Sequence, residues 1–378
     1  MTAVHGMCDD RFTNVRTAFE QKLASNEELG ASIYLDIDGT RAIDLWGGHR
    51  DRARAVPWTE DTIVNVWSTT KTVTTLAALL LVERGKLDVH QTVAHYWPEF
   101  AANGKEAIEV RHLMSHTSGV SGWEQPFQTE DMYDWDASTR KLAGQAPWWK
   151  PGTASGYHAG NQGHLVGEVI RRITGKHLKD FVATELAGPL GADFQIGARE
   201  EDWRRIANVV PPPPLSLDFS ALDPKSPMVK TFSAVAPAAA ANTPSWRRAD
   251  MGALNGHGNA RSVIAMLSTI ARGGNANGTR LLSDETIDLV FEEQSNGVDL
   301  VLGVPLCFGV GLALPQRDTV PYIPDERICF WGGWGGSLIV MDVGRRMTFG
   351  YMMNKMAPGI IGSPRSEAYL SAVYDALR

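Results

Sequence analysis

Apolar and polar residues follow two different periodicities along this chain, one typical of helices and one typical of strands. A helical spacing of apolar residues runs over 12–24, and the next two runs, 32–37 and 41–46, alternate as half-buried strands do. Asp38-Gly39 separates these two runs and predicts a hairpin turn, because both residues tolerate positive φ angles. We therefore expect the chain to open with a helix and a β-hairpin.

A second long helix is predicted over 68–84, where the apolar spacing is again helical and Gly85 is placed to end it. The next part of the chain, about 87–290, has few strand patterns. The pattern there predicts helices, among them 111–115, 161–174 and 262–272, that are joined by long loops. The prolines at 211–214 exclude a helix or a central strand there, so they predict an extended surface connection.

Strand patterns return near the end of the chain. They cover 308–313, 328–331, 337–343 and 347–353, and a last helix is predicted over 366–377. Strands at both ends with helices between them predict an α+β fold, in which one antiparallel sheet is built from the two termini. We expect 1–86 and 291–378 to form the sheet domain, 87–290 to form a mainly helical insertion, and the active site to lie at the seam.

Composition and charge narrow the classes of partner. The chain has 378 residues, of which 43% are hydrophobic and 21% are charged, as in a globular protein. Its formal net charge of -7 leaves no basic surface for phosphate backbones or anionic lipid, so neither a nucleic acid nor a membrane is an expected partner. The longest strongly apolar run, 76–82, is far shorter than the roughly 20 residues that a membrane-spanning helix needs. A small neutral ligand is the expected partner.

The beginning of the chain and the cysteines bear on the cellular compartment. The start contains two acidic residues and no apolar stretch of the signal-peptide type, so we expect a cytoplasmic location. Cys8, Cys307 and Cys329 are odd in number and far apart, which suits reduced structural thiols better than disulfides or a metal site. We assign these thiols no catalytic role.

A Ser-x-x-Lys motif, Ser68 to Lys71, stands at the beginning of the second predicted helix. A spacing of three stacks both side chains on one helical face, where a partly neutral lysine can take the proton of the serine. The helix N-terminus also brings backbone N–H groups close to a developing oxyanion. A second copy, Ser138 to Lys141, follows acidic, loop-like sequence, and we interpret its serine as a helix cap.

Four further segments extend the pattern around Ser68. In order, the five read V-W-S-T-T-K-T at 66–72, L-M-S-H-T-S-G at 113–119, W-K-P-G-T-A-S-G-Y at 149–157, N-G-H-G-N-A-R-S at 255–262 and W-G-G-W-G-G-S at 331–337. In order and spacing the chain resembles class C beta-lactamases, family VIII carboxylesterases and related penicillin-binding-protein-like hydrolases, over about 12–377. The resemblance implies the fold of that family, an antiparallel sheet flanked by terminal helices with an inserted helical region.

The resemblance also implies roles for three side chains. Ser68 is expected to be the acyl-accepting nucleophile, Lys71 its proton partner and Tyr157 the general base of the family's Tyr-x-Asn motif. We expect a lysine ammonium near Tyr157 to lower the pKa of the phenol. The asparagine of the motif is absent, since Ala159 stands in its place. His158 is placed with the substrate-binding residues, although a structural role is the simpler interpretation.

The family's Lys-Thr-Gly motif appears here as Trp331-Gly332-Gly333, a variant that resembles the esterases. Tryptophan in place of lysine removes a partner for a substrate carboxylate and offers an apolar wall. By position, the backbone N–H groups of Ser68 and Trp334 are expected to form the oxyanion hole. We place Trp331, Gly332, Gly333 and Trp149 among the substrate-binding residues.

Several other residues fall within or beside the family segments. Trp148, Trp246 and Trp334 are candidates for an apolar cleft, although each is more often simple core. His116 and the asparagines at 255 and 259 are interpreted as residues that fix loops through hydrogen bonds.

Three other kinds of active site have partial sequence signatures that can be compared with the chain. The run from Asp36 to Thr40 matches the Asp-x-Asp-Gly-Thr signature of magnesium-dependent haloacid-dehalogenase-like phosphatases, but that fold needs a parallel sheet. His112 and His116 have the spacing of metal ligands without a zincin motif around them, so no metal is expected. Gly-x-Ser-x-Gly, the α/β-hydrolase nucleophile motif, does not occur.

The resemblance leaves three activities open. They are ester hydrolysis, beta-lactam or D-amino-acid peptide hydrolysis, and acyl transfer to an alcohol or amine. Loss of the motif asparagine and lysine favours the first, so we expect a serine carboxylesterase that acts on short-chain or small hydrophobic esters without a cofactor. The oligomeric state is not predicted.

Overall fold

The predicted hairpin around Asp38-Gly39 is present and forms one end of the main sheet. The computed structural model describes residues 3–213, 222–276 and 278–378. Asp38 and Gly39 have φ angles of 50° and 83°, as a tight turn between twisted antiparallel strands requires. The turn joins β2 (Gly30–Ile37) to β3 (Thr40–Gly48) in antiparallel register. The phosphatase interpretation needs a parallel sheet, whereas β2, which contains Asp36, pairs in antiparallel register with β3 and with β15 (Met347–Met353).

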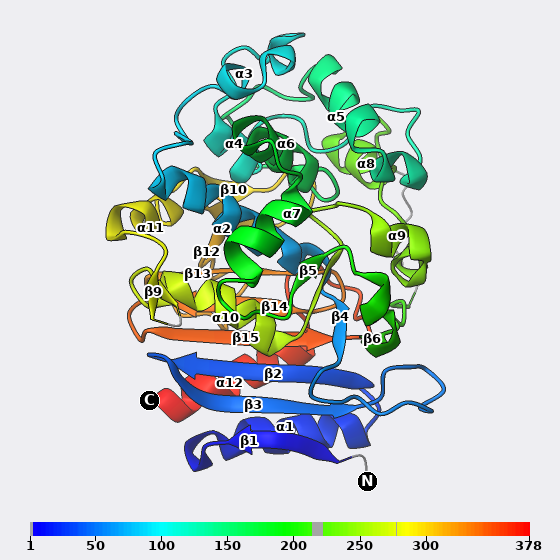
Figure 1. Cartoon of the computed structure of the whole chain (residues 1–378), viewed down its shortest axis with the longest axis vertical. Helices are drawn as coiled ribbons and strands as arrows, with labels where there is room; N and C mark the ends of the chain where they lie inside the picture. The colour runs from blue at the N-terminus through cyan, green and yellow to red at the C-terminus, as the bar shows by residue number, and fades with distance from the viewer. Residues whose placement is uncertain (1–2, 214–221, 277) are drawn as a thin grey trace.

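The main sheet is antiparallel throughout and draws its strands from both ends of the chain (Figure 1). Its order is β1-β3-β2-β15-β14-β13-β12-β11-β10. The remaining strands of this sheet are β1 (Val4–Cys8), β10 (Ser295–Val298), β11 (Pro305–Phe308), β12 (Ala313–Leu314), β13 (Ile328–Gly332), β14 (Leu338–Asp342) and β15 (Met347–Met353). The predicted strand over 308–313 is wrong, because 309–312 form a turn in which Gly311 has a φ of +88°.

A smaller sheet lies among the helices, close to the predicted nucleophile. Its strands are β5 (Gln195–Ile196), β7 (Gly256–Gly258), β4 (Ile63–Asn65) and β6 (Ile206–Ala207), in that order. A short hairpin of β8 (Asn275–Ala276) and β9 (Thr279–Arg280) stands apart. Strand β4 leads directly to Ser68 and pairs with both β6 and β7, so the entry to the nucleophile turn is held on both sides.

The helices lie on both faces of the main sheet and fill the region beyond it (Figure 1). They are α1 (Thr13–Ala24), α2 (Thr70–Glu83), α3 (Val93–Tyr96), α4 (Val110–Met114), α5 (Trp135–Gly144), α6 (Gln162–Thr174), α7 (Leu178–Val182), α8 (Pro227–Phe232), α9 (Pro244–Arg248), α10 (Ala260–Ala271), α11 (Asp284–Val290) and α12 (Pro364–Leu377). In the described ranges, none of these helices is long and apolar enough to cross a bilayer.

Alternate residues of β14 face two different cores, as the two-residue period of a strand requires. Leu338 and Val340 pack in the cluster that includes α1 and α12. Ile339 and Met341 pack in the larger cluster that includes α2 and α10. Helix α10 lies in the segment 87–290, which we expected to form a helical insertion, yet it packs on β2, β14 and β15.

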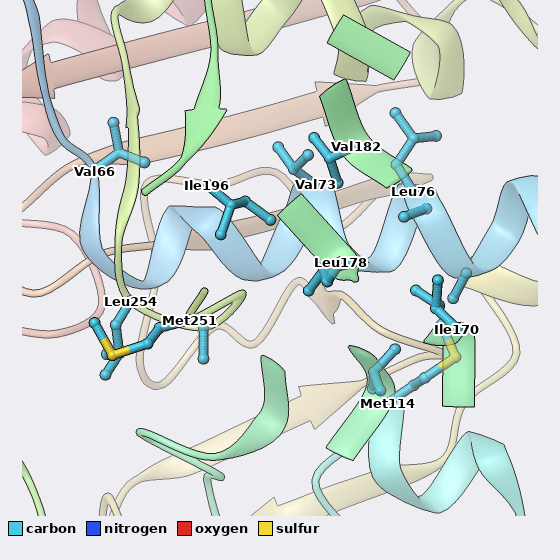
Figure 2. Close-up of a cluster of buried hydrophobic side chains, with 14 of the residues drawn as sticks. Val66, Val73, Leu76, Met114, Ile170, Leu178, Val182, Ile196, Met251 and Leu254 are labelled. Atoms are coloured by element: carbon cyan, nitrogen blue, oxygen red, sulfur yellow. The ribbon is translucent and has the colours of Figure 1, made fainter. Parts of the chain in front are cut away.

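The larger core surrounds α2 and holds the helix that follows the nucleophile. Figure 2 shows Val73 and Leu76 of α2 among Leu178 and Val182 of α7. All four side chains are completely buried. Burying one such side chain stabilises the fold by about 1.5–3 kcal/mol, so this packing fixes the position of α2.

The proline-rich segment is only partly described. Residues 211–213 belong to no helix or strand, as the prolines predict. Position 214 lies outside the described residues. Just before the prolines, Val210 donates its amide to the Asn354 carbonyl, 2.8 Å away, and bridges to Lys355.

Candidate active site

Ser68 lies in a tight turn between β4 and α2. The turn is a single 3₁₀ segment, Trp67–Thr69, and Trp67 has a φ of 52°. This left-handed conformation costs a bulky residue on the order of 1–3 kcal/mol and persists only where packing enforces it. Trp246 and Trp334 supply that packing through edge-to-face contacts with Trp67, at centroid distances of 5.5 and 5.2 Å.

Lys71 brings its amine to the nucleophile. Its Nζ lies 3.0 Å from Ser68 Oγ, 2.9 Å from the Ala159 carbonyl and 3.0 Å from the Ala253 carbonyl. Complete burial lowers the pKa of Lys71 well below its usual value. A neutral amine has two N–H bonds and one lone pair. The two carbonyls match the two N–H bonds, which leaves the lone pair for the hydroxyl proton of Ser68.

Tyr157 lies close to both Lys71 and Ser68. Lys71 Nζ lies 4.8 Å from the centroid of the phenol ring, and Trp331 Nε1 donates to Tyr157 Oη over 3.1 Å. Burial raises the pKa of Tyr157, hydrogen bonds from Ser68 and Trp331 oppose the rise, and the charge of Asp299 adds to it. The expected lowering of this pKa by lysine is therefore wrong. Tyr157 is a neutral phenol that can pass a proton on.

The glycine-rich segment after β13 approaches the nucleophile turn very closely. A Cβ on Gly333 would lie 2.4 Å from the Val66 carbonyl oxygen, so only glycine fits there. Ser337 Oγ donates to the same Val66 oxygen over 3.0 Å and lies 3.0 Å from Thr69 Oγ1. These contacts tie the segment to both sides of Ser68.

The Trp334 amide has the free donor that an oxyanion hole requires. Its neighbours Gly335 and Gly336 have φ angles of +97° and +114°, and Gly335 N donates to the Gly359 carbonyl over 2.9 Å. Among the described residues, none accepts a hydrogen bond from Trp334 N. The oxyanion hole of Ser68 and Trp334 stays a prediction that this geometry permits.

A cavity of about 590 Å³ opens at Ser68 and has an almost wholly apolar lining. Its walls come from the nucleophile turn, the α8 region, the loop before β11 and the segment before α12. The lining residues are Trp67, Ser68, Tyr157, Ala159, Met228, Phe232, Val235, Ala236, Pro237, Trp246, Leu254, Val301, Leu302, Val304, Thr319, Trp334, Pro358, Ile360 and Ile361. None of the described residues of the lining carries a charged side chain, so the cavity suits a neutral apolar group.

The structure brings together only part of the predicted substrate-binding set. Trp246 and Trp334 line the cavity, whereas Trp331, Gly332 and Gly333 lie beside it without lining it. Trp331 is 2% exposed and acts on the site through its hydrogen bond to Tyr157.

Trp149 and His158 are also absent from the cavity lining. His158 is completely buried, and its ring nitrogens bond to Ser118 Oγ at 2.6 Å and to the Gly156 carbonyl at 2.7 Å. Trp149 Nε1 donates to the Ala154 carbonyl and its ring covers Gly156. These contacts give both residues a structural role, and their predicted part in substrate binding stays a prediction.

Loop-fixing roles are confirmed for His116 and the two asparagines. His116 Nδ1 accepts the amide of His158 over 3.1 Å, and its ring packs 4.9 Å from that of Tyr157. Asn255 bonds the backbone of Met251 and Ala249 in its own loop and the Trp246 carbonyl of α9. The Ala253 carbonyl of the same loop accepts from Lys71. Asn259 caps α10.

The second Ser-x-x-Lys copy and the histidine pair lie outside this site. Ser138 is inside α5, whose cap is Asp134, so the expectation that Ser138 caps a helix is wrong. His112 Nδ1 accepts the amide of Glu109 in the cap of α4. Across the described ranges, no three His, Cys, Asp or Glu side chains gather as a metal site would require.

Sequence reasoning missed two polar residues of the site, Thr319 in the cavity lining and Asp299 beside Tyr157. Asp299 Oδ1 accepts the backbone amide of Tyr157 over 3.1 Å, although the residues are far apart in the chain. Asp299 lies outside every motif segment, and no pattern in the sequence marks it. The apolar residues of the loop that it begins were missed for the same reason.

The chain resembles known proteins over nearly its whole length. It is 30% identical over 370 residues to the esterase/beta-lactamase LipL of Mycobacterium tuberculosis, an alignment that covers 95% of this chain and 84% of that protein. It is 32% identical over 190 residues to the esterase EstB of Burkholderia gladioli, which covers 46% of this chain and 48% of that one.

Solved structures agree in fold and extent. A family VIII carboxylesterase matches with a TM-score of 0.92 and 36% identity, covering 99% of this chain and 100% of that one. A penicillin-binding-protein homologue from Caulobacter crescentus matches with the same TM-score and coverage at 35% identity. The model of the beta-lactamase family matches residues 15–373. With the geometry around Ser68, these matches show that the chain belongs to the beta-lactamase family and has its penicillin-binding-protein-like fold.

Proposed function

We propose that the protein is a serine carboxylesterase that hydrolyses short-chain or small hydrophobic esters through an acyl-enzyme on Ser68. The observation that carries the proposal is the position of the buried Lys71 amine, 3.0 Å from Ser68 Oγ, beside a cavity whose described lining residues carry no charged side chain. A lysine whose pKa is lowered by burial is a base suited to a serine nucleophile.

The proposed reaction is a double displacement. Ser68 Oγ attacks the ester carbonyl while its proton passes to Lys71, and the oxyanion is received by the amides of Ser68 and Trp334. Collapse of the tetrahedral intermediate breaks the bond to the alcohol oxygen, which takes the proton through Tyr157. Water then attacks the acyl-enzyme and gives a proton to Lys71 and Tyr157. The bond between the acyl carbon and Ser68 Oγ breaks, Oγ takes that proton, and the acid is released. No cofactor takes part in this sequence of steps.

The cavity favours esters over the other substrates of such a site. Beta-lactams and D-amino-acid peptides carry a carboxylate, and within the described part of the chain no lining residue offers a cation to pair with it. Trp331 occupies the place of the family lysine and bonds Tyr157 instead. The relatives named as esterases and the 36% identical carboxylesterase support the same choice. The name of the LipL relative makes beta-lactam hydrolysis the second candidate.

Intact-mass spectrometry tests the proposal directly. Wild type and Ser68→Ala are exposed briefly to p-nitrophenyl butyrate and to nitrocefin, and turnover of both is measured in parallel. We expect one butyryl group on the wild type, none on the variant, and slow or absent nitrocefin cleavage. Rapid nitrocefin hydrolysis would transfer the assignment to a beta-lactamase, and no acylation by either compound would reject the serine hydrolase mechanism.

A further inference from the structure

Asp299 is a buried carboxylate beside the site to which the proposed mechanism gives no role. It begins the loop 299–304 between β10 and β11, and its side chain is completely buried. None of the described cations forms an ion pair with it, and its Oδ2 has no hydrogen-bond partner among the described residues. An isolated buried charge is costly, so its environment must supply the compensation.

That compensation comes from backbone amides. Asp299 Oδ1 accepts from Tyr157 N at 3.1 Å, from Val301 N at 2.9 Å and from Leu302 N at 2.8 Å. Hydrogen bonds to a charged acceptor contribute about 1.5–3 kcal/mol each, more than bonds between neutral groups. A second link runs beside them, since Leu300 N donates to the Ser155 carbonyl over 2.8 Å. The loop is therefore attached to the segment that carries Tyr157.

The same oxygen also controls part of the cavity wall. Val301 and Leu302, whose amides it holds, line the 590 Å³ cavity together with Val304 of the same loop. A displacement of Asp299 would move the phenol and the apolar wall together. No other described side chain accepts a hydrogen bond from the Tyr157 amide.

The charge of Asp299 acts on Tyr157 as well. It adds to the rise that burial produces in the pKa of Tyr157, and so favours the protonated phenol. The other titratable groups that face the ring are Lys71, 4.8 Å from its centroid, and His116, 4.9 Å between ring centroids. Burial lowers the pKa of both groups, so their neutral forms are favoured.

We propose that Asp299 is a positioning residue that places the Tyr157 hydroxyl for proton delivery to the leaving alcohol while it fixes the adjoining cavity wall. The proposal rests on the proposed esterase function. It concerns the step in which the bond to the alcohol oxygen breaks and that oxygen gains a proton. The residue acts through Tyr157 and through the loop, and does not contact the substrate.

Two esters with the same acyl group and different leaving groups test this role. An ethoxide must be protonated as it leaves, whereas p-nitrophenolate leaves without a proton. We would measure kcat/KM for ethyl butyrate and for p-nitrophenyl butyrate and follow the ratio of the two values. Both esters give the same acyl-enzyme, so the ratio isolates the leaving-group step. Tyr157→Phe sets the reference for complete loss of proton delivery.

In Asp299→Ala we expect the ratio to fall at least about 10-fold, a part of the 100- to 10,000-fold that general acid catalysis typically supplies. Asp299→Asn keeps an acceptor for the three amides but loses the charge, so its ratio should fall at least about threefold, and less than that of the alanine variant. Asp342→Asn is the matched control. Asp342 is equally buried, bonds the Arg345 amide at the far end of β14, and should leave the ratio unchanged.

The outcomes separate this inference from the proposed function. If the wild type hydrolyses neither ester, the esterase function itself fails. If the wild type is active and a folded Asp299 variant keeps the wild-type ratio within twofold, the positioning role is rejected, even where both rates fall together. Circular dichroism identifies the folded variants, and Asp299→Asn decides the question if Asp299→Ala does not fold.

Discussion

The chain contains the same four-residue motif twice, and only one copy has the geometry of a catalytic site. In the first copy, Lys71 Nζ lies 3.0 Å from Ser68 Oγ, and both residues are buried next to the cavity. In the second, Ser138 Oγ donates to the Asp131 carbonyl over 2.8 Å, and Lys141 Nζ donates to the Pro126 carbonyl over 2.7 Å. The same spacing therefore gives a reactive pair only where the serine hydroxyl and the lysine amine contact each other. In the second copy, backbone carbonyls bind both groups instead.

Lys105 is a useful second comparison, because its side chain is also shielded from solvent. Its Nζ donates to three carbonyls, those of Ala102, Ala143 and Gln145. Three acceptors match the three N–H bonds of an ammonium, and burial lowers its pKa only to about 8. Lys71 has two carbonyls and a serine hydroxyl, which match a neutral amine. Burial lowers the pKa of both lysines, and the charge of Glu106 opposes that lowering at Lys105.

Replacement of each serine by alanine should produce the largest difference in turnover between the two motifs. Ser68→Ala removes the nucleophile, so turnover of p-nitrophenyl butyrate should fall by at least about 10,000-fold, as in other serine hydrolases. Ser138→Ala should change turnover less than about twofold, since its hydroxyl serves only a helix contact. Steady-state kinetics of both purified variants provide the measurement. A large loss in Ser138→Ala with an intact fold would contradict the assignment of the site.

Replacement of each lysine by methionine should produce a smaller difference in kcat than replacement of the serines. In Lys71→Met the serine loses its proton acceptor, and we expect kcat to fall about 1,000-fold, within the 100- to 10,000-fold range of general base catalysis. Lys141→Met leaves Ser68 untouched, so kcat should stay within about twofold of the wild type. Pre-steady-state acylation by p-nitrophenyl butyrate distinguishes slow acylation from slow deacylation. Rapid acylation of Lys71→Met would show that another group is the base.

The pH dependence should separate the two lysines further. Protonated Lys71 cannot accept the Ser68 proton, so kcat/KM should fall about tenfold per pH unit below the pKa of Lys71, which burial lowers. Burial also lowers the pKa of His158 to about 3 and that of His116 well below its usual value, so neither histidine should set this limb. The profile of Lys141→Met should coincide with that of the wild type. A profile without an acid limb down to pH 4 would contradict the role of Lys71 as a neutral base.

The same shift predicts a stability effect of definite sign. Between the lowered pKa of folded Lys71 and the usual lysine value of about 10.4, the unfolded chain binds more protons than the folded chain. The free energy of unfolding from this group therefore rises with pH through that window. Chemical denaturation at several pH values, compared with Lys71→Met, isolates the contribution. A variant with the same slope as the wild type would exclude it.

Local patterns were sufficient for the elements that carry the nucleophile. The periodicity over 68–84 and the turn at Asp38-Gly39 both correspond to observed elements, because each depends on neighbouring residues. Strand β1 was missed, since Val4–Cys8 is short and becomes a strand by pairing with β3. The pKa direction of Tyr157 was wrong because burial, which a sequence does not display, outweighs nearby groups. The cavity wall at 299–304 was missed because only folding brings it to Ser68.

The smallest expected effect is the contribution of Ser138, in the second motif, to the stability of the protein. Ser138 is completely buried, and its hydroxyl bond to the Asp131 carbonyl joins α5 to the turn before it. In Ser138→Ala that carbonyl loses a partner, so the free energy of unfolding should fall by about 1 kcal/mol. Urea denaturation of the variant gives the value, and Ser138→Thr, which keeps the hydroxyl, is the control for hydrogen bonding. A loss of stability together with unchanged kcat would show that the same three-residue spacing serves catalysis at Ser68 and structure at Ser138.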